Sequence, residues 1–198
     1  DIVEMVLSGR INTELVTLLN HHAMAERGTH VARAVGMSGK DGGLFRACKL
    51  RSDDGRDLGR MGEIVAVNAD LLELLLGKEY VPVLSPLGLG NDGEGYHLNA
   101  DWVAAEVAIA LHAEKLIYLT DHPGILEHGE LISEMNAEQL RQKIAAGIVH
   151  GSMLIKAQAV LKALAHGVRS AHFVDGRVPH GVVAELFTDH GVGTLVTP

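Results

Sequence analysis

The sequence predicts an α/β fold with a mainly parallel sheet and helices on both faces. Short aliphatic runs bounded by turn residues alternate along the chain with helical segments of ten or more residues, and this alternation implies βαβ units. Hydrophobic residues make up 47% of the 198 residues, but aromatic residues only 4%. The core must therefore be built from Ala, Val, Leu and Ile, as in Ala-rich helices packed on aliphatic strands.

The N-terminal half predicts a helix, a strand, a hairpin, a second helix and a strand, in that order. Asn12 is expected to cap the first helix and Asn68 the second, which Gly77 would end. Residues 1–9 already look like the inside of a helix without a cap, so a segment before them is expected to be missing. The predicted strands, the last of them a buried parallel strand, are residues 31–37, 43–50, 61–68 and 80–88.

The C-terminal half alternates more regularly between helices and strands. An Ala-rich helix is predicted over residues 101–113, and Asn136 with Gln139 makes a capping-box pattern for the next helix. Ser152 is expected to open a further helix, in which apolar residues recur at helical spacing until Gly167 closes it. The remaining predicted segments are the helix 137–147, the strands 115–121 and 169–176, and the helix 178–191.

Charge and composition argue against several classes of protein. The net charge is −8 and the 17 Lys and Arg are scattered, which disfavours binding to nucleic acid through phosphates. No apolar run approaches the roughly 20 residues that span a bilayer, and no signal peptide opens the chain, so a cytoplasmic protein without a membrane partner is expected. The 12 histidines lack metal-ligand spacing, so no metal held by the protein is expected.

Two glycine-rich stretches allow a structural as well as a functional interpretation. "GLGNDG" (88–93) satisfies the pattern G-x-G-x-x-G after a predicted strand, but no helix follows directly. A dinucleotide site is therefore disfavoured, and the stretch is interpreted as a chance match to the pattern or as a flexible loop that covers a site. "GMSGKDGG" (36–43) places Lys40 and glycine N–H groups after a strand, where they would face an anion or form a solvated turn.

Lys156 lies one turn inside the helix that Gly151 and Ser152 are expected to open. The N–H groups and the dipole of a helix N-terminus attract an anion there, and the lysine would add to that attraction. The alternative is an ordinary surface lysine on an amphipathic helix.

Asp101 has a similar ambiguity, because an Asp at a helix N-terminus is a good cap. Asn99 and Asp101 follow one predicted strand, however, and Thr120 and Asp121 end the next. Ligands of open α/β sheets bind at the C-terminal ends of parallel strands. A functional carboxylate and a helix cap therefore both remain open for Asp101.

Six strings, taken in order, resemble the amino acid kinase family and, within it, the N-acetylglutamate kinases. They are "AVGMSGKDGGL", "GEIVAVN", "VPVLSPLGLGNDGEGYHLNAD", "AEKLIYLTDHPGIL", "GSMLIK" and "VDGRVPHGVVAELFTDHGVGT", and they cover nearly the whole chain at nearly the family's spacing. The resemblance implies a three-layer αβα sandwich with a mainly parallel central sheet, partial at the N-terminus. It also implies a single domain over residues 1–198, mainly the nucleotide-binding half.

The resemblance implies ATP-dependent phosphorylation of the side-chain carboxylate of N-acetyl-L-glutamate in arginine biosynthesis, with Mg²⁺ carried by the ATP. By the family pattern, Asp101 orients the catalytic lysines and Lys156 is one of them. Phosphoryl transfer needs positioning and charge stabilisation more than covalent help, which suits such a pair. The matching nucleotide-binding positions are Thr120, Asp121, Gly124, Gly151 and Met153.

The sequence also departs from the family pattern. The family's first strand with its catalytic lysine, the glycine-rich loop and the arginine that grips the substrate have no counterpart. His97 stands where members usually carry Asn, beside Asn99, and both are implied substrate-binding positions, so the acidic substrate is open. The C-terminal string is close to that of arginine-inhibited members, and a homo-oligomer is expected of the complete protein. The implied effector positions are Lys115, His172, Glu185 and Gly191.

Two other functions remain open. One is an arginine-sensing, non-catalytic kinase-like domain of an acetylglutamate synthase, although a sensor has no need for both Asp101 and Lys156. The other is a sister kinase that acts on another acidic amino acid, an alternative that His97 supports.

Overall fold

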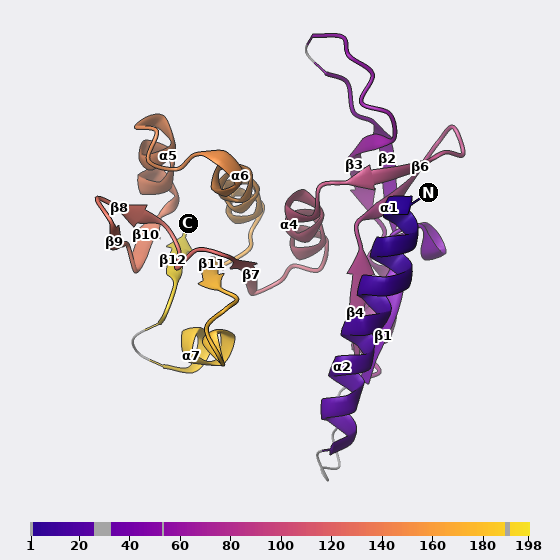
Figure 1. Ribbon diagram of the computed structural model, residues 1–198, viewed down its shortest axis with the longest axis horizontal. Coiled ribbons are helices and arrows are strands. Elements are labelled where there is room, and N and C mark those ends of the chain that lie inside the picture. Colours follow the sequence, from indigo (N-terminus) through magenta and orange to yellow (C-terminus); the bar gives the residue numbers. More distant parts are fainter. Residues whose placement is uncertain (1, 26–32, 53, 189–190) are drawn as a thin grey trace. The chain divides into compact units, whose positions relative to one another are not determined.

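The protein is described here by a computed structural model, in which residues 2–25, 33–52, 54–188 and 191–198 are placed (Figure 1). The chain forms two compact units, Asp1–Val103 and Ala104–Pro198, and the division falls inside helix α4 (Ala100–Ala110). Each unit is an α/β structure in its own right.

The first unit begins with one continuous helix: α1 (Ile2–Glu4), a π-helical stretch η1 (Met5–Ile11) and α2 (Asn12–Ala25). Asn12 has helical backbone angles, φ −59° and ψ −47°, so the predicted cap at Asn12 is wrong. Residues 2–9 are helical, as expected, and Asp1 lies outside the described residues. The buried Asn12 side chain instead donates from Nδ2 to the Val83 carbonyl at 2.8 Å, which fixes the helix to a strand.

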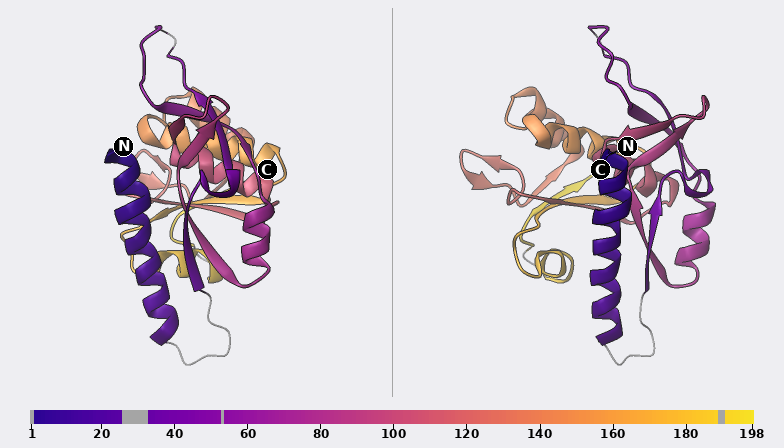
Figure 2. Two further views of the ribbon diagram at one scale, coloured as in Figure 1. Left: turned by 90° about the vertical axis from the view of Figure 1, so that its right-hand side faces the viewer. Right: turned by 45° about the vertical axis from the view of Figure 1, so that its right-hand side comes forward.

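Two parallel strands, β1 (Arg33–Ser38) and β4 (Tyr80–Ser85), lie within or close to the predicted segments 31–37 and 80–88; residues 31–32 lie outside the described residues, and the second strand ends before Pro86. Figure 2 shows the long helix on one face of this pair and α3 (Asp70–Leu76) on the other. Val81 is 41% exposed, so β4 is only half-buried and the prediction of a buried strand is wrong. Among the described residues β4 pairs only with β1, which leaves its other side open.

The N-terminus of α3 differs from the prediction by one residue. Ala69 occupies the cap position, and the Asn68 side chain only accepts from the Asp70 N–H at 3.3 Å. Gly77 follows the last helical residue, as predicted.

The other four strands of the first unit close into a small barrel in the order β2-β3-β6-β5. The predicted hairpin between its first two strands is confirmed, because they pair antiparallel. "GLGNDG" forms most of β5 and part of the turn into β6, so the expectation of a flexible loop there is wrong. The barrel strands are β2 (Phe45–Lys49), β3 (Met61–Val67), β5 (Leu87–Gly90) and β6 (Gly95–Leu98).

The second unit contains a four-stranded sheet in the order β10-β12-β11-β7. β10 and β12 are parallel, as are β11 and β7, whereas β12 runs antiparallel to β11. Figures 1 and 2 show α5 and α6 on one face of this sheet and α7 on the other. The strands are β7 (Lys115–Thr120), β10 (Glu134–Asn136), β11 (Ser170–Asp175) and β12 (Thr194–Thr197). The helices are α5 (Ala137–Ala145), α6 (Gly151–Ala165) and α7 (Gly181–Phe187).

In the second unit, the observed helix ends can be compared with the caps predicted from the sequence. Asn136 and Gln139 exchange both bonds of the capping box at 2.8 Å, as predicted. α6 begins at Gly151, directly after the N-cap His150, so Gly151 and Ser152 do open this helix. Gly167, with φ +98°, follows the last turn of α6, as predicted.

α7 is shorter than predicted at its start. Residues 178–180 form a turn in which the Gly181 N–H donates to the Val178 carbonyl, and His180 has a left-handed backbone. Residues 189–190 of the predicted helix lie outside the described residues. The short hairpin β8 (Leu126–Glu127) and β9 (Glu130–Leu131) was not predicted.

The α/β class, the parallel strand pairs and the helices on both faces are confirmed in each unit. No helix in the described part of the chain is long and apolar enough to cross a membrane.

Candidate active site

A cavity of about 340 Å³ in the second unit brings together three of the predicted nucleotide-binding residues. Gly124, Gly151 and Met153 all line it. The cavity lies between the loop that follows β7 and the turn that begins α6, and Ile125 and Ile148 add apolar surface. An apolar wall beside a helix N-terminus suits a ligand with a flat apolar part and an anionic part.

The N-terminus of α6 offers an anion site within this cavity. His150 is its N-cap but makes no side-chain cap hydrogen bond, so this side chain does not satisfy the first N–H groups of the helix. These groups and the helix dipole favour negative charge. Lys156 is half-buried and lies four residues after Ser152, on the same helix face, but it does not line this cavity, so its role at the anion site remains a prediction.

Thr120 and Asp121 lie at the C-terminal end of β7 but do not line this cavity. The Thr120 hydroxyl accepts from the His122 N–H at 2.9 Å, which shapes the turn. The Asp121 carboxylate lies 2.7 Å from His122 Nδ1, and this hydrogen bond lowers the pKa of Asp121. With 79% of its side chain exposed, Asp121 can meet a ligand only at the rim of the site.

Asp175 ends β11, in register with Thr120 of β7. Its carboxylate accepts from the Arg177 N–H, Nε and Nη2 at 2.9, 2.9 and 2.8 Å. These bonds lower the pKa of Asp175 from its ordinary value of 3.8 to about 2. This bidentate pair was not predicted, because only the turn residues around it were recognisable in the sequence.

The lowered pKa of Asp175 predicts a specific acid sensitivity. The carboxylate stabilises the fold fully above pH 3.8, and this stabilisation is lost as the pH falls towards 2. Unfolding in urea should therefore show a steeper loss of stability over this interval in the wild type than in Asp175→Asn. Equal slopes for the two proteins would show that the Arg177 pair does not contribute.

Asn99 caps α4 in the first unit, and Asp101 does not. The Asn99 side-chain oxygen accepts from the Asp101 N–H at 2.9 Å and from the Trp102 N–H at 3.2 Å, and its carbonyl accepts from the Val103 N–H. The N-cap of α4 is therefore Asn99 and not Asp101, and the half-buried Asp101 lies in the first turn of the helix, where a carboxylate interacts favourably with the helix dipole. Asn99 has only its amide N–H groups left for a substrate.

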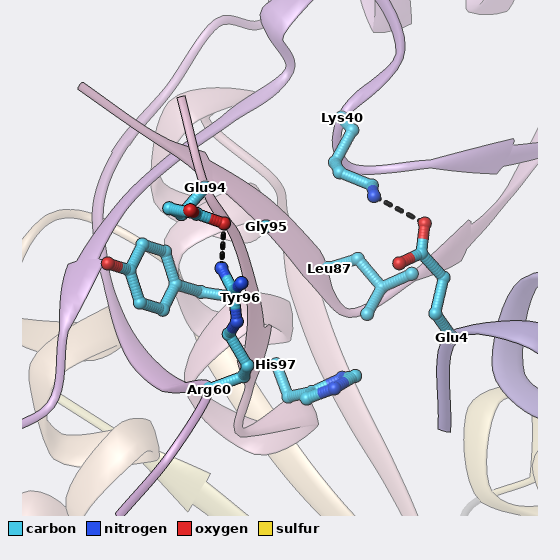
Figure 3. Close-up of a pocket in the computed structure, with 8 residues that line it drawn as sticks. All are labelled: Glu4, Lys40, Arg60, Leu87, Glu94, Gly95, Tyr96 and His97. Atoms are coloured by element: carbon cyan, nitrogen blue, oxygen red, sulfur yellow. Dashed lines mark hydrogen bonds and ion pairs between the residues drawn. The ribbon is translucent and has the colours of Figure 1, made fainter. Parts of the chain in front are cut away.

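His97 lies in a cavity of about 110 Å³ in the first unit, shown in Figure 3. Its Nδ1 is buried and has no hydrogen-bond partner among the described residues. A buried polar atom left unpaired costs roughly 1–3 kcal/mol, so a ligand atom that pairs with this Nδ1 would be stabilised. Lys40 pairs with Glu4 at the edge of this cavity, and the ammonium lowers the pKa of Glu4.

Several N–H groups of the loop "GMSGKDGG" already have acceptors in the first unit. The N–H of Ser38 donates to the Asp41 carboxylate, that of Lys40 to the Ser38 hydroxyl and that of Gly39 to the Ser85 carbonyl. These bonds favour the interpretation of the loop as a turn, and its lysine faces a cavity.

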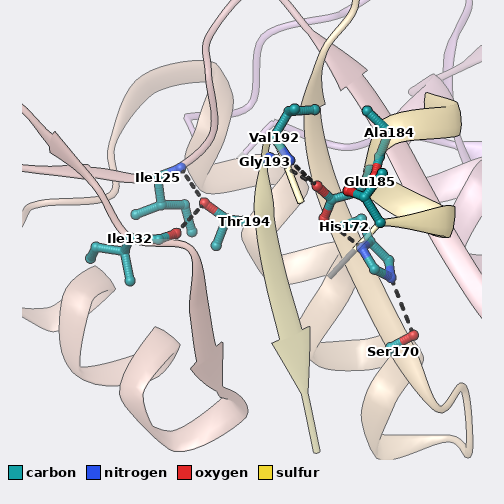
Figure 4. A network of polar contacts seen from close by, with 10 residues as sticks. Ile125, Ile132, Ser170, His172, Ala184, Glu185, Val192, Gly193 and Thr194 are labelled. Carbon is teal, nitrogen blue, oxygen red and sulfur yellow. Dashed lines mark hydrogen bonds and ion pairs between the residues drawn. The ribbon is translucent and has the colours of Figure 1, made fainter. Parts of the chain in front are cut away.

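Two of the predicted effector residues, His172 and Glu185, meet at one buried carboxylate (Figure 4), and a third, Gly191, lies against it. Glu185 Oε1 lies 2.8 Å from His172 Nδ1, and Oε2 accepts from the N–H groups of Val192 and Gly193 at 2.7 and 2.9 Å. Gly191 packs so closely on this carboxylate that an added Cβ would collide with it. The Glu185 side chain is 3% exposed, so a guanidinium would have to displace one of these partners.

Lys115, the fourth predicted effector position, is exposed at the start of β7. It lies in register with Ser170, whose hydroxyl is 3.4 Å from His172 Nε2. Its participation in an effector site remains a prediction.

Glu185→Gln is expected to lower the free energy of unfolding by roughly 1.5–3 kcal/mol, because a neutral amide replaces a buried acceptor of charge-assisted bonds. The NH₂ group of the introduced glutamine would also face N–H donors, such as those of Val192 and Gly193. Chemical denaturation measures the loss. Glu138→Gln, on an exposed side chain of α5, is the matched control and should change stability by no more than about 0.5 kcal/mol. Equal effects of the two substitutions would contradict the proposed importance of the buried network.

The described residues contain no group of three or more His, Cys, Asp or Glu able to hold a metal ion. His97, Asn99 and Asp101 belong to the first unit, whereas the predicted nucleotide and effector residues and Lys156 belong to the second. Their convergence in one site remains a prediction.

A model of the amino acid kinase family matches residues 1–175. The chain belongs to the amino acid kinase family. Among curated members, it is 46% identical over 208 residues to the acetylglutamate kinase of Nitrosococcus oceani, covering 99% of this chain and 66% of that protein. The chain spans about two thirds of the length of the curated relatives it matches.

Solved structures of the family support the same fold. The Streptococcus mutans protein smu.665 superposes with a TM-score of 0.79 at 26% identity, covering 98% of this chain and 69% of that one. The N-acetylglutamate synthase of Neisseria gonorrhoeae, in complex with coenzyme A and N-acetyl-glutamate, gives a TM-score of 0.77 at 25% identity, covering 96% and 43%. The amino acid kinase fold predicted from the sequence is thereby confirmed.

Proposed function

We propose that this chain belongs to an N-acetylglutamate kinase, which transfers the terminal phosphoryl group of ATP to the side-chain carboxylate of N-acetyl-L-glutamate. The observation that carries the proposal is the 46% identity to an acetylglutamate kinase over 99% of this chain. Asp101 and Lys156 of the family pattern are both retained, as a kinase requires and a pure sensor does not.

The proposed reaction joins a carboxylate oxygen of the substrate to the γ-phosphorus and breaks the bond to the β,γ-bridging oxygen, leaving ADP. The acceptor is already ionised, so no general base is needed. Lys156 would neutralise charge that develops on the transferring group, assisted by the N-terminus of α6. Asp101 would orient lysine ammonium groups. Mg²⁺ would be carried by the ATP phosphates and water, as this cation prefers.

The proposal assigns the cavity at Gly124, Gly151 and Met153 to the nucleotide, with Thr120 and Asp121 at its rim. His97 and Asn99 would contact the amino acid. We further propose that the complete protein is a cytoplasmic homo-oligomer in which both units form one kinase domain.

Calorimetric titration of this chain with ATP, and coupled assays on the protein expressed from its full reading frame, test the proposal. ATP binding to both forms and phosphorylation of N-acetyl-L-glutamate are expected. Preferred turnover of aspartate, glutamate or an aminoadipate derivative would favour the sister-kinase alternative instead. Absence of ATP binding from both forms would exclude a kinase.

The second candidate is an arginine-sensing, kinase-like domain of an acetylglutamate synthase. Its support is the similarity to the Neisseria gonorrhoeae synthase and the buried His172–Glu185 pair at the implied effector position. Arginine binding without ATP binding would favour this candidate. Binding of both would instead favour a kinase that arginine regulates through Lys115, His172, Glu185 and Gly191.

A further inference from the structure

The cavity around His97 contains a lysine to which the family pattern gives no role. We propose that Lys40 binds a carboxylate of the amino-acid substrate, that Glu4 positions its ammonium, and that His97 makes a neighbouring contact. The inference rests on the proposed function, because it concerns the same substrate.

Lys40 reaches the cavity across the backbone of Gly95. A Cβ added at Gly95 would lie 3.3 Å from Lys40 Nζ and 3.7 Å from its Cδ, so the lysine stem lies directly on this glycine. In Figure 3 the Tyr96 ring points away from the Lys40–Glu4 pair, whereas the His97 ring lies on the side of Glu4 and Leu87. The ammonium and the imidazole therefore border the same space.

Glu4 forms an ion pair with the Lys40 ammonium but leaves that ammonium able to donate further hydrogen bonds. The two side chains are 29% and 39% exposed, so the pair is partly withdrawn from water. A lysine ammonium has three N–H donors, and the bond to Glu4 engages one. A carboxylate that enters the cavity can accept another, and the partly buried setting strengthens this charge-assisted bond.

His97 gives the cavity a second unmet polar atom, the buried Nδ1 that has no partner among the described residues. Arg60, the other cation of the lining, is paired with Glu94 and is 53% exposed. Arg60 is therefore less suited than Lys40 to bind a substrate carboxylate. A cavity of about 110 Å³ has room for one polar end of an amino acid and not for the whole molecule.

Lys40→Met is expected to raise KM for N-acetyl-L-glutamate roughly ten- to hundredfold, the usual cost of one charge-assisted hydrogen bond, with kcat and KM for ATP nearly unchanged. The assay uses the protein expressed from its full reading frame. Lys40→Arg should recover part of the loss. Lys49→Met is the matched control, because Lys49 also pairs with an acid, Asp57, but on the exposed hairpin. It should leave KM unchanged.

A charge swap separates binding from a merely structural ion pair. Glu4→Lys combined with Lys40→Glu restores an ion pair but moves the cation onto the helix. If Lys40 binds substrate, the double variant keeps the raised KM; recovery of a wild-type KM would overturn the proposal. The swap also serves as the test if Lys40→Met fails to fold, since it retains the pair.

Failure of this inference is distinguishable from failure of the proposed function. A wild-type protein that phosphorylates N-acetyl-L-glutamate, with an unchanged KM in Lys40→Met, overturns only the role of Lys40. A wild-type protein that does not turn over N-acetyl-L-glutamate contradicts the proposed function, and the role of Lys40 falls with it.

Discussion

Asp101→Asn is expected to lower kcat by roughly 10²–10³-fold while the KM for ATP changes little. The substitution keeps the shape of the side chain but removes the charge that is proposed to orient ammonium groups in the transition state. Stability should fall less than in Asn99→Ala, because Asn99 supplies the cap oxygen of α4. Steady-state kinetics and thermal unfolding of the same preparation measure both quantities.

Asn99→Ala tests the cap itself through stability, apart from the raised KM that its proposed contact with the amino acid would cause. Without the Asn99 side-chain oxygen, the N–H groups of Asp101 and Trp102 lose their acceptor. We expect this to lower the free energy of unfolding by about 1 kcal/mol. If Asp101→Asn lost stability and kept its kcat, the carboxylate would be a structural residue and its assignment to the active site would be wrong.

Much of the fold could be predicted from sequence because the longer elements have strong local patterns. The capping box at Asn136 and the aliphatic runs of β1, β7 and β11 are readable within a few residues. The misplaced cap at Asn12 shows the limit of such local signals. Its amide serves the Val83 carbonyl, 71 residues away, and the helix simply continues through it.

Short strands escaped prediction for the same reason. β8, β9 and β10 have two or three residues each, too few for any alternation to be recognised. β5 and β6 were hidden by their glycines, which read as a loop although they close a barrel. In both cases pairing with a distant strand, and not local propensity, decides the conformation.

The candidate site was predictable where the family pattern is continuous. Gly124, Gly151 and Met153 were named from the sequence and line one cavity. The Lys40–Glu4 pair joins residues 36 positions apart, and Glu185 is held by N–H groups of a later segment. Neither arrangement has a local signature, so only a three-dimensional structure reveals it.

Lys156→Met is expected to lower kcat by roughly 10²–10³-fold, because it removes a positive charge at the start of α6 where charge develops in the proposed transition state. Stability should be nearly retained, since Met keeps the apolar stem of a half-buried side chain. Lys162→Met, one and a half turns further along α6, is the control for loss of a lysine from this helix and should keep its kcat.

The double variant Asp101→Asn with Lys156→Met then tests whether the two residues act together, although they belong to different compact units. When two residues act together, the effects of substituting them on kcat are strongly non-additive. If Asp101 works by orienting Lys156, the double variant should lose hardly more kcat than Lys156→Met alone. Multiplication of the two single losses would mean that Asp101 acts independently of Lys156, and its proposed role as the orienting carboxylate of this lysine would have to be abandoned.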